Sequence, residues 1–211
     1  LLAEKLIDLH PWAKMVKFAR TGGEANAIAI RVARAASGRD NVAFCGYHGW
    51  HDWYLATNIK KNKNLNDHLL KNLLVDGVPK NLANSIFPFK YNDYEQLEKI
   101  VNEKNVGVIC MEVMRNEVPK NFFLQKIRKL ADKKGIVLIF DECTSGFRKN
   151  YGGLHKLYSV NPDIALFGKA MGNGYAITAV IGKKEVMENA QNSFISSTFW
   201  TERIGPTAAL A

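Results

Sequence analysis

The chain alternates short apolar runs with longer segments of helical periodicity, and this alternation is the feature that most constrains its fold. The apolar runs are MVKFA (15–19), NVAFCG (41–46), VGVICM (106–111), IVLIF (136–140), IALF (164–167) and TAVIG (178–182). Strands that are buried on both faces of a parallel sheet read as continuous apolar runs of this kind. We therefore interpret these runs as the strands of one sheet.

The segments between the runs have the spacing of amphipathic helices. In one of them Ile127 and Leu130 fall on one face, while Lys126 and Lys129 take the other. Alternation of strands and helices predicts an α/β fold in which helices flank a mostly parallel sheet. The helices are expected at 24–37, 93–104, 122–134 and 183–190.

The region 55–90 does not follow this alternation. It is rich in asparagine and lysine and has little periodic pattern. Long excursions from a compact α/β domain are often lids or binding loops, and we expect this role here. The chain begins without methionine and ends inside a helical pattern, so we expect residues 1–211 to be a piece of a longer protein.

The formal net charge of +9 raises the question of a nucleic-acid or membrane partner. Carboxylates stand between the groups of lysines, a pattern typical of solvated helix faces. We therefore expect neither a nucleic acid nor a membrane as partner, although a compact anionic ligand suits the charge. The lysines in question are Lys60, Lys61, Lys63, Lys126, Lys129, Lys133 and Lys134.

The cysteines indicate a cytoplasmic protein. Cys45, Cys110 and Cys143 are odd in number, have no C-x-x-C spacing, and lie in or beside apolar runs, as buried thiols do. No apolar stretch is long enough to span a membrane, and no signal peptide is visible.

Ligands of such sheets bind beyond the carboxyl ends of the strands, so the residues after each run are the candidates. After MVKFA, Thr21 can cap the next helix and Glu24 can reach back, as in a T-x-x-E capping box. Gly22 and Gly23 let backbone N–H groups approach an anion at the helix N-terminus. The segment is either a phosphate-binding site or an ordinary capped helix start.

The turn YHGWHDW follows the second run. His48, His51 and Asp52 have part of a metal-ligand spacing, but no further ligand with suitable spacing is present, and we expect no metal. Tyr47 beside Gly49 favours stacking on a planar ring, since glycine leaves room for it. The alternative is a turn rich in amphipathic residues.

Asp141 and Glu142 follow IVLIF, where they match the magnesium-binding carboxylates of an ATPase. That function needs a phosphate loop of the form G-x-x-x-x-G-K-[ST]. The Gly168–Lys169 pair is the only candidate, and Asp163 stands at the first glycine position while Ala170 stands at the hydroxyl position. The loop fails at both places.

Lys169 follows IALF, and a partly desolvated amine there is a nucleophile. A lysine that forms a Schiff base with pyridoxal phosphate (PLP) needs a carboxylate for the ring nitrogen, a helix N-terminus for the phosphate, and flat groups around the ring. Asp141, the turn 21–24, and Tyr47 with Cys143 can supply them. Asp141 and Cys143 are two residues apart, so in an extended segment they face the same side.

These residues stand in segments that resemble one family throughout the chain. The segments are VKFARTGGEANAIAIRVARAASGRDNVAFCGYHGWHD, GVPKNLANSIFPFKYND, IFDECTSGFR, PDIALFGKAMGNGYAITAVIG and SSTFW, in the family's order. The chain resembles the class-III, fold-type-I PLP-dependent aminotransferases, and among them glutamate-1-semialdehyde 2,1-aminomutase-like sequences. The resemblance implies that residues 1–211 are the cofactor-binding large domain of this fold, without the rest of the N-terminal segment and without the C-terminal small domain.

The resemblance also implies roles for single residues. Lys169 is expected to carry the Schiff base, Asp141 to pair with the pyridine nitrogen, and Glu112 to belong to the active-site network. Thr198 is expected to reach the phosphate of a neighbouring subunit's cofactor, which implies a homodimer with shared active sites. The full cofactor-binding set is Thr21, Gly22, Gly23, Tyr47, His48, Glu112, Asp141, Cys143, Lys169 and Thr198.

The chain departs from the family pattern at several positions. Gly23 stands where threonine is usual, so one hydroxyl contact to the phosphate is lost. Cys143 replaces a usual valine, and Val113 and Ala176 replace common prolines. The segments EVMRNEVP and GKAMGNGY resemble aminotransferase-like proteins of surface-sugar biosynthesis, and 55–75 does not match the aminomutase lid.

The expected function is PLP-dependent transfer of an amino group to or from a small molecule. The alternatives are an aminotransferase of a surface-sugar pathway and a PLP-binding protein without catalysis. An ATPase and a basic nucleic-acid binder are further alternatives, and the broken phosphate loop and the scattered lysines count against them.

Overall fold

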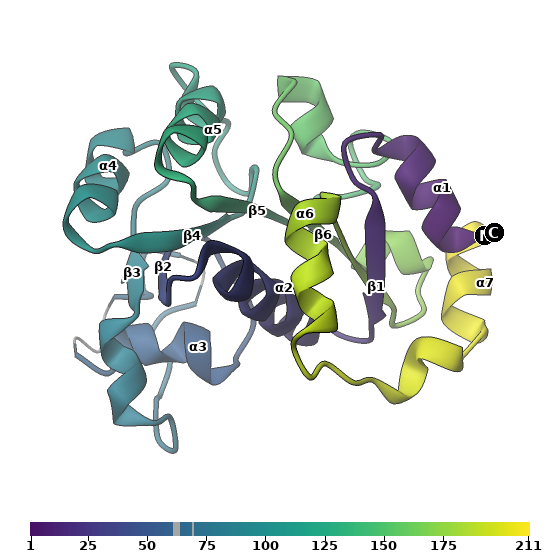
Figure 1. Cartoon of the computed structure of the whole chain (residues 1–211), viewed down its shortest axis with the longest axis horizontal. Helices are drawn as coiled ribbons and strands as arrows, with labels where there is room; N and C mark the ends of the chain where they lie inside the picture. The colour runs from purple at the N-terminus through teal and green to yellow at the C-terminus, as the bar shows by residue number, and fades with distance from the viewer. Residues whose placement is uncertain (61–63, 69) are drawn as a thin grey trace.

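A seven-stranded sheet forms the centre of the chain, in the order β1-β7-β6-β5-β4-β2-β3 (Figure 1). The structure is a computed structural model that describes residues 1–60, 64–68 and 70–211, without the side chains of 198 and 199. The strands are β1 (Met15–Ala19), β2 (Asn41–Cys45), β3 (Ile86–Pro88), β4 (Val106–Met111), β5 (Val137–Glu142), β6 (Ile164–Phe167) and β7 (Thr178–Gly182). The strands β3, β2, β4, β5 and β6 run parallel, and β7 is antiparallel to both β1 and β6. The predicted α/β fold with a mostly parallel sheet is confirmed.

Helices connect most of these strands. The α-helices are α1 (Leu2–Leu9), α2 (Gly22–Ser37), α3 (Asp52–Leu55), α4 (Tyr94–Glu103), α5 (Phe123–Lys134), α6 (Lys184–Met187) and α7 (Ile204–Leu210). Short 3₁₀ turns are η1 (Ala56–Asn58), η2 (Lys80–Asn84), η3 (Leu154–Tyr158), η4 (Lys169–Gly172), η5 (Glu188–Gln191) and η6 (Thr198–Thr201). The helices predicted at 24–37, 93–104 and 122–134 are α2, α4 and α5, and the one predicted at 183–190 is α6 followed by η5.

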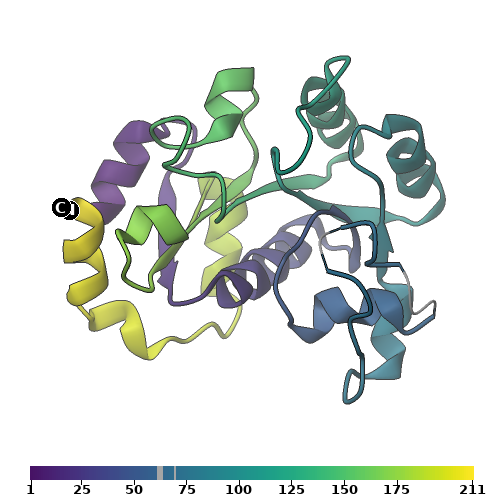
Figure 2. The same ribbon diagram turned by 180° about the vertical axis from the view of Figure 1, so that it is seen from behind.

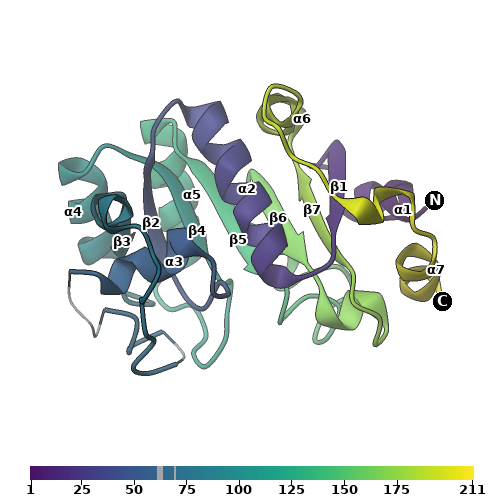
Figure 3. The ribbon, with the colours of Figure 1, turned by 90° about the horizontal axis from the view of Figure 1, so that it is seen from below.

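The sheet has a helical layer on each face (Figure 3). Alternate side chains of a strand point to opposite faces, so each apolar strand fills two cores. On one face Phe44 and Val180 pack with α2 and α6. On the other face Ile109 and Leu138 pack with α4 and α5. Burial on both faces is the reason that the strands read as unbroken apolar runs.

The two ends of the chain lie together at the β1 side of the sheet. Figure 2 shows α1 and α7 side by side there. Leu2 and Leu6 of α1 pack with Phe167 and Ile181 in a third apolar cluster. The sequence pattern had not predicted α1, because it precedes the first strand and covers an end of the sheet instead of connecting two strands.

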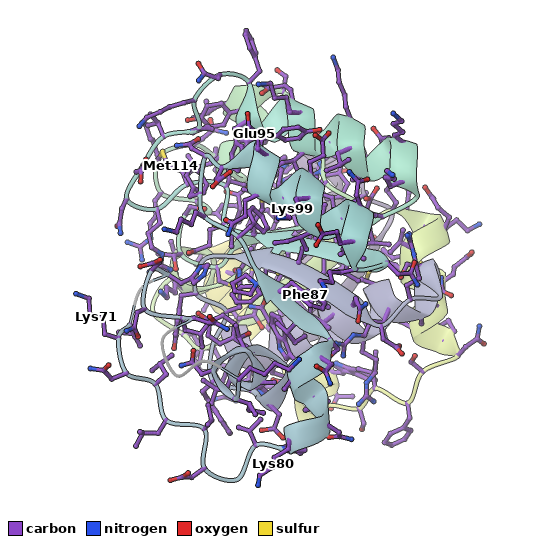
Figure 4. All side chains as sticks on the ribbon, turned by 90° about the vertical axis from the view of Figure 1, so that its left-hand side faces the viewer. Lys71, Lys80, Phe87, Glu95, Lys99 and Met114 are labelled. Atoms are coloured by element: carbon purple, nitrogen blue, oxygen red, sulfur yellow. The ribbon has the colours of Figure 1, made fainter. Side chains whose placement is uncertain are left out.

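The region 55–90 contains η1, η2 and the edge strand β3, and residues 61–63 and 69 lie outside the described part. β3 was missed in the sequence because it has three residues, one of them Pro88, which is confined to sheet edges. Figure 4 looks onto this edge, with Phe87 on β3 and the side chains of Lys71 and Lys80 pointing away from the protein. Lys61 and Lys63 lie outside the described residues, and the lid function stays a prediction.

Candidate active site

The predicted site residues gather at one cavity, where the carboxyl ends of β2 and β5 meet the first turn of α2. Its volume is about 390 Å³. It is lined by Thr21, Gly22, Gly23, Asn26, Tyr47, His48, Gly49, Trp50, His51, Asp141, Cys143, Thr144 and Lys169. Of the predicted set, Glu112 does not line this cavity, the side chain of Thr198 lies outside the described part, and all the other residues line it.

Asp141 is the buried carboxylate of the cavity. Its Oδ2 accepts hydrogen bonds from Asn26 Nδ2 and His48 Nδ1, each at 2.8 Å, and its Oδ1 accepts one from the Cys143 N–H at 3.0 Å. Burial by itself raises the pKa of Asp141, but these hydrogen bonds outweigh it, and the pKa lies below its ordinary value. Asp141 is consequently an anion at neutral pH.

His48 is the counter-ion of Asp141. Its Nδ1 faces the carboxylate, and its Nε2 lies 3.2 Å from the carbonyl oxygen of Cys45. Both oxygens can only accept, so both ring nitrogens carry hydrogen and the ring is an imidazolium. Burial lowers the pKa of His48, but the Cys110 thiol and Asp141 outweigh burial and hold the pKa well above its usual range. The cavity thus contains a buried ion pair.

Asn26 is a site residue that the sequence analysis missed. It is 1% exposed, and its Nδ2 donates both to Asp141 and to the carbonyl oxygen of Gly22, 2.9 Å away. A signal was present in the sequence, since Asn26 is a polar residue in the stripe of α2 that holds Ala29, Ile30 and Ala33. A buried amide among apolar residues of a helix needs partners, and here they are the site carboxylate and the helix itself.

Cys143 lines the cavity one step beyond β5. Burial raises the pKa of its thiol well above the ordinary value, and the neighbouring Asp141 adds to this effect. The thiol is therefore neutral, and it offers a compact apolar surface in place of a competing nucleophile. Tyr47 lies half-buried at the same cavity and is the aromatic candidate for ring stacking.

Lys169 begins the turn η4, and only Gly168 separates it from the end of β6. Its Nζ donates to Thr144 Oγ1 at 3.0 Å, and its backbone has the left-handed value φ = 45°. Lys169 as a whole is exposed, because it lies in η4 after the buried strand has ended, and the partial desolvation of its amine stays a prediction. It also lines a second cavity of about 580 Å³, together with Arg148 and Tyr175.

The first turn of α2 has the predicted capping arrangement. Thr21 Oγ1 accepts from the Glu24 N–H at 3.2 Å, and Glu24 Oε2 accepts from the Arg20 N–H at 2.8 Å. The return bond goes to the residue before the cap, one position earlier than in the usual capping box. The N–H groups of Gly22 and Gly23 have no acceptor within the helix and lie at the cavity wall, where an anion is favoured.

Glu112 lies behind this cavity instead of lining it. It borders a smaller cavity of about 90 Å³, accepts from the Tyr47 N–H at 3.1 Å, and forms a bidentate ion pair with Arg115. Arg115 Nη2 also donates to Thr144 Oγ1 at 3.3 Å. Glu112 thus reaches Lys169 through Arg115 and Thr144, two residues that the sequence analysis had not singled out.

Glu142 turns to the opposite face of β5 from Asp141. It accepts from Ser145 Oγ at 2.9 Å, from the Leu154 N–H at 2.6 Å, and from His155 Nδ1 at 2.5 Å. The alternation of the strand thus separates the two carboxylates, and Glu142 takes no part in the cavity around Asp141. The side chain of Thr198 lies outside the described part, so its role stays a prediction.

The fold and the site together define a class of protein: an α/β domain that brings a lysine, a buried carboxylate and a helix N-terminus to one cavity beyond the sheet. The family model for aminotransferase class-III matches residues 1–211. The chain belongs to this family.

Curated relatives support this assignment. The chain is 38% identical over 218 residues to 3-aminobutyryl-CoA aminotransferase of Cloacimonas acidaminovorans, covering 99% of the chain and 49% of the relative. It is 36% identical over 196 residues to glutamate-1-semialdehyde 2,1-aminomutase of Methanobrevibacter smithii, covering 89% of the chain and 45% of the relative. The chain thus spans about half the length of the curated relatives it matches.

Solved structures agree with the fold. An omega-transaminase from Sphaerobacter thermophilus is 28% identical, with a TM-score of 0.85 over 99% of this chain and 51% of that one. The FumI protein of Sphingopyxis sp. MTA144, 23% identical, has a TM-score of 0.84 over 99% of this chain and 49% of that one, and shows the fold alone. In the described residues, no helix has the length and apolar character needed to cross a membrane.

Proposed function

We propose that the protein containing this chain transfers amino groups with PLP as its cofactor. The observation that carries the proposal is the convergence of Lys169, Asp141 and the N-terminus of α2 on one cavity in a class-III aminotransferase chain. The residues present fit the cofactor. An ionised carboxylate suits the pyridine nitrogen, the α2 N-terminus suits the phosphate, and Tyr47 and Cys143 suit the ring faces.

When bound, PLP supplies an aldehyde that exchanges amines and a ring that takes up the electron pair of a broken substrate C–H bond. The chain's own contribution begins with Lys169 Nζ, which would take the proton from the substrate's α-carbon and deliver it to the carbon that carries the cofactor's aldehyde, so that the amino group can leave the substrate. The Thr144 hydroxyl, 3.0 Å from Nζ, orients the amine for this task.

His48 and Asn26 keep Asp141 ionised and fixed in place, so that Asp141 would hold a proton on the ring nitrogen of the bound cofactor. The carboxylate still has lone pairs for another donor, because Oδ1 accepts only the Cys143 N–H among the described residues. The negative charge of Asp141 suits this chemistry, because it favours a protonated ring nitrogen, and a protonated ring nitrogen draws electrons from the reacting carbon.

The first test is the visible absorption spectrum of the full-length protein purified with PLP, beside its Lys169→Ala variant. We expect a yellow wild-type protein and an altered band in the variant, which has no amine to bond to the cofactor's aldehyde. A colourless wild-type protein would refute PLP dependence. A variant with normal turnover would refute the role of Lys169.

The substrate is a small molecule that gives or accepts an amino group, either between two molecules or within one. Both kinds of reaction occur in the names of the relatives, an aminotransferase and an aminomutase. An aminotransferase of a surface-sugar pathway is the further candidate that the segments EVMRNEVP and GKAMGNGY favour. Amines that bleach the visible band, with or without a second keto substrate, separate transfer from rearrangement.

We further propose a homodimer in which Thr198 of one subunit completes the neighbouring site. An exposed aromatic residue at the rim supports an interface, since Trp50 is 71% exposed beside the cavity, and tryptophan is enriched in interfaces. Mixing the Lys169→Ala and Thr198→Ala variants after dissociation is expected to restore activity, because one site of each mixed dimer is intact. Mixtures that stay inactive contradict shared sites.

A cytoplasmic location is proposed as well. Cys45, Cys110 and Cys143 are free and buried, as is usual for thiols kept in a reducing compartment. Fractionation of cells that express the full-length protein tests it, and recovery in a secreted or membrane fraction contradicts it.

A further inference from the structure

Gly23 lies directly against the ring of His51. A Cβ atom at Gly23 would lie 2.6 Å from both Nδ1 and Cε1 of the His51 ring, closer than real side chains approach. The backbone of the turn that carries His51 also lies close to Gly23: a Cβ atom at Gly49, whose φ is 93°, would be 3.0 Å from Gly23 Cα. The ring of His51 therefore fills the volume that a side chain at position 23 would take.

His51 has a polar atom in need of a partner. Nδ1 is shielded from solvent and has no hydrogen-bond partner among the described residues. The ring is held by Trp50, whose ring centroid is 4.8 Å away at an interplanar angle of 31°. A shielded nitrogen without a partner is unfavourable, and this one belongs to a residue that lines the cavity together with Gly22 and Gly23.

We propose that His51 is a ligand of the cofactor's phosphate and replaces the side chain that Gly23 lacks. This inference rests on the proposed function. An imidazole N–H donates a hydrogen bond to a phosphate oxygen, and such a bond to a charged acceptor is stronger than one between two neutral groups. The helix N-terminus alone offers backbone N–H groups, so the side-chain donor comes from the neighbouring turn. Glycine at position 23 is then the condition for this arrangement.

The test compares PLP with pyridoxal, which lacks the phosphate, by titration of the full-length apoprotein. For His51→Ala we expect the Kd for PLP to rise about 10- to 100-fold, the range of one hydrogen bond to a charged group. The Kd for pyridoxal is expected to stay within about twofold, because a single lost phosphate contact does not affect it. The readout is the ratio of the two constants. His68→Ala, outside the cavity, is the matched control and leaves the ratio unchanged.

Two further variants test whether a side chain at position 23 and the His51 ring can replace each other. Gly23→Thr alone is expected to weaken PLP binding because it collides with the His51 ring. Gly23→Thr combined with His51→Ala is expected to recover affinity for PLP, since the threonine hydroxyl then has room to reach the phosphate. His51→Asn and His51→Gln keep an N–H donor near Nδ1 or Nε2 and identify the nitrogen that binds.

Each outcome bears on one claim. If the wild-type protein binds no PLP, the proposed function fails and the inference with it. If it binds PLP but His51→Ala changes both constants by the same factor, His51 only packs against α2 and the inference alone is overturned. The phosphorus NMR signal of the bound cofactor gives a second measure: it is expected to shift in His51→Gln, and an unchanged signal overturns the contact.

Discussion

Replacing Asp141 with asparagine tests the buried ion pair directly. The carboxylate accepts three hydrogen bonds, from Asn26, His48 and the Cys143 N–H. An asparagine has one acceptor oxygen, so its NH₂ group must face one of these donors. The His48 imidazolium also loses its counter-ion. Removing one partner of a buried pair costs about 3–5 kcal/mol. We expect Asp141→Asn to lower the free energy of unfolding by about 3 kcal/mol, the low end of this range. The reason is that His48 without its counter-ion returns toward its ordinary pKa of 6.5 and can lose its proton at neutral pH, so no unpaired charge stays buried.

The pH dependence identifies the cause of the loss. The pKa of His48 is raised in the folded state, so its contribution is complete below 6.5 and is lost as pH rises through the folded pKa. Each unit by which the folded pKa exceeds 6.5 is worth about 1.4 kcal/mol. The pKa of Asp141 is lowered, so its contribution is present above 3.8 and is lost as pH falls through the folded value.

The assay is urea unfolding of the full-length protein freed of PLP, at a series of pH values from acid to alkaline. Wild-type stability is expected to fall from neutral to alkaline pH more steeply than that of Asp141→Asn, in which His48 is already neutral. The difference between the two curves removes the effect of other titrating groups. Parallel curves over the whole range would refute the argument that His48 and Asp141 are a charged pair.

Three further predictions concern single residues. Lys169→Gly should be more stable than Lys169→Ala by about 1 kcal/mol in thermal unfolding, because glycine adopts the left-handed backbone at φ = 45° without steric cost. Equal melting temperatures of the two variants would contradict backbone strain at this position. Cys143 in the folded apoprotein should resist iodoacetamide at mildly alkaline pH, since its pKa is raised, and rapid labelling would contradict a neutral buried thiol. Glu142→Gln should lower the free energy of unfolding by about 1–3 kcal/mol, because the N–H of Leu154 and the ring of His155 lose a carboxylate acceptor. The Kd for PLP should not change. A change in that Kd would place Glu142 at the site after all.

The sequence by itself determined six of the described strands, all except β3, and the residues that follow them. Strands buried on two faces are apolar throughout, so β4, β5 and β6 were visible as runs. Because parallel strands end at one edge, Asp141 and Lys169 were predicted to meet there, and the cap of α2 was readable from Thr21 and Glu24. Each of these features depends on residues that are close together in the chain, so the spacing of residues in the sequence is enough to predict it.

The tertiary structure alone decided the direction of β7, the edge strand β3, and the partners inside the site. Asn26 and His48 meet Asp141 across 115 and 93 residues, and no local pattern encodes which donor reaches which oxygen. The same holds for the His51 ring against Gly23, since a glycine shows only that a side chain is missing. What fills the space is set by the packing of another turn, and that is a property of the folded chain.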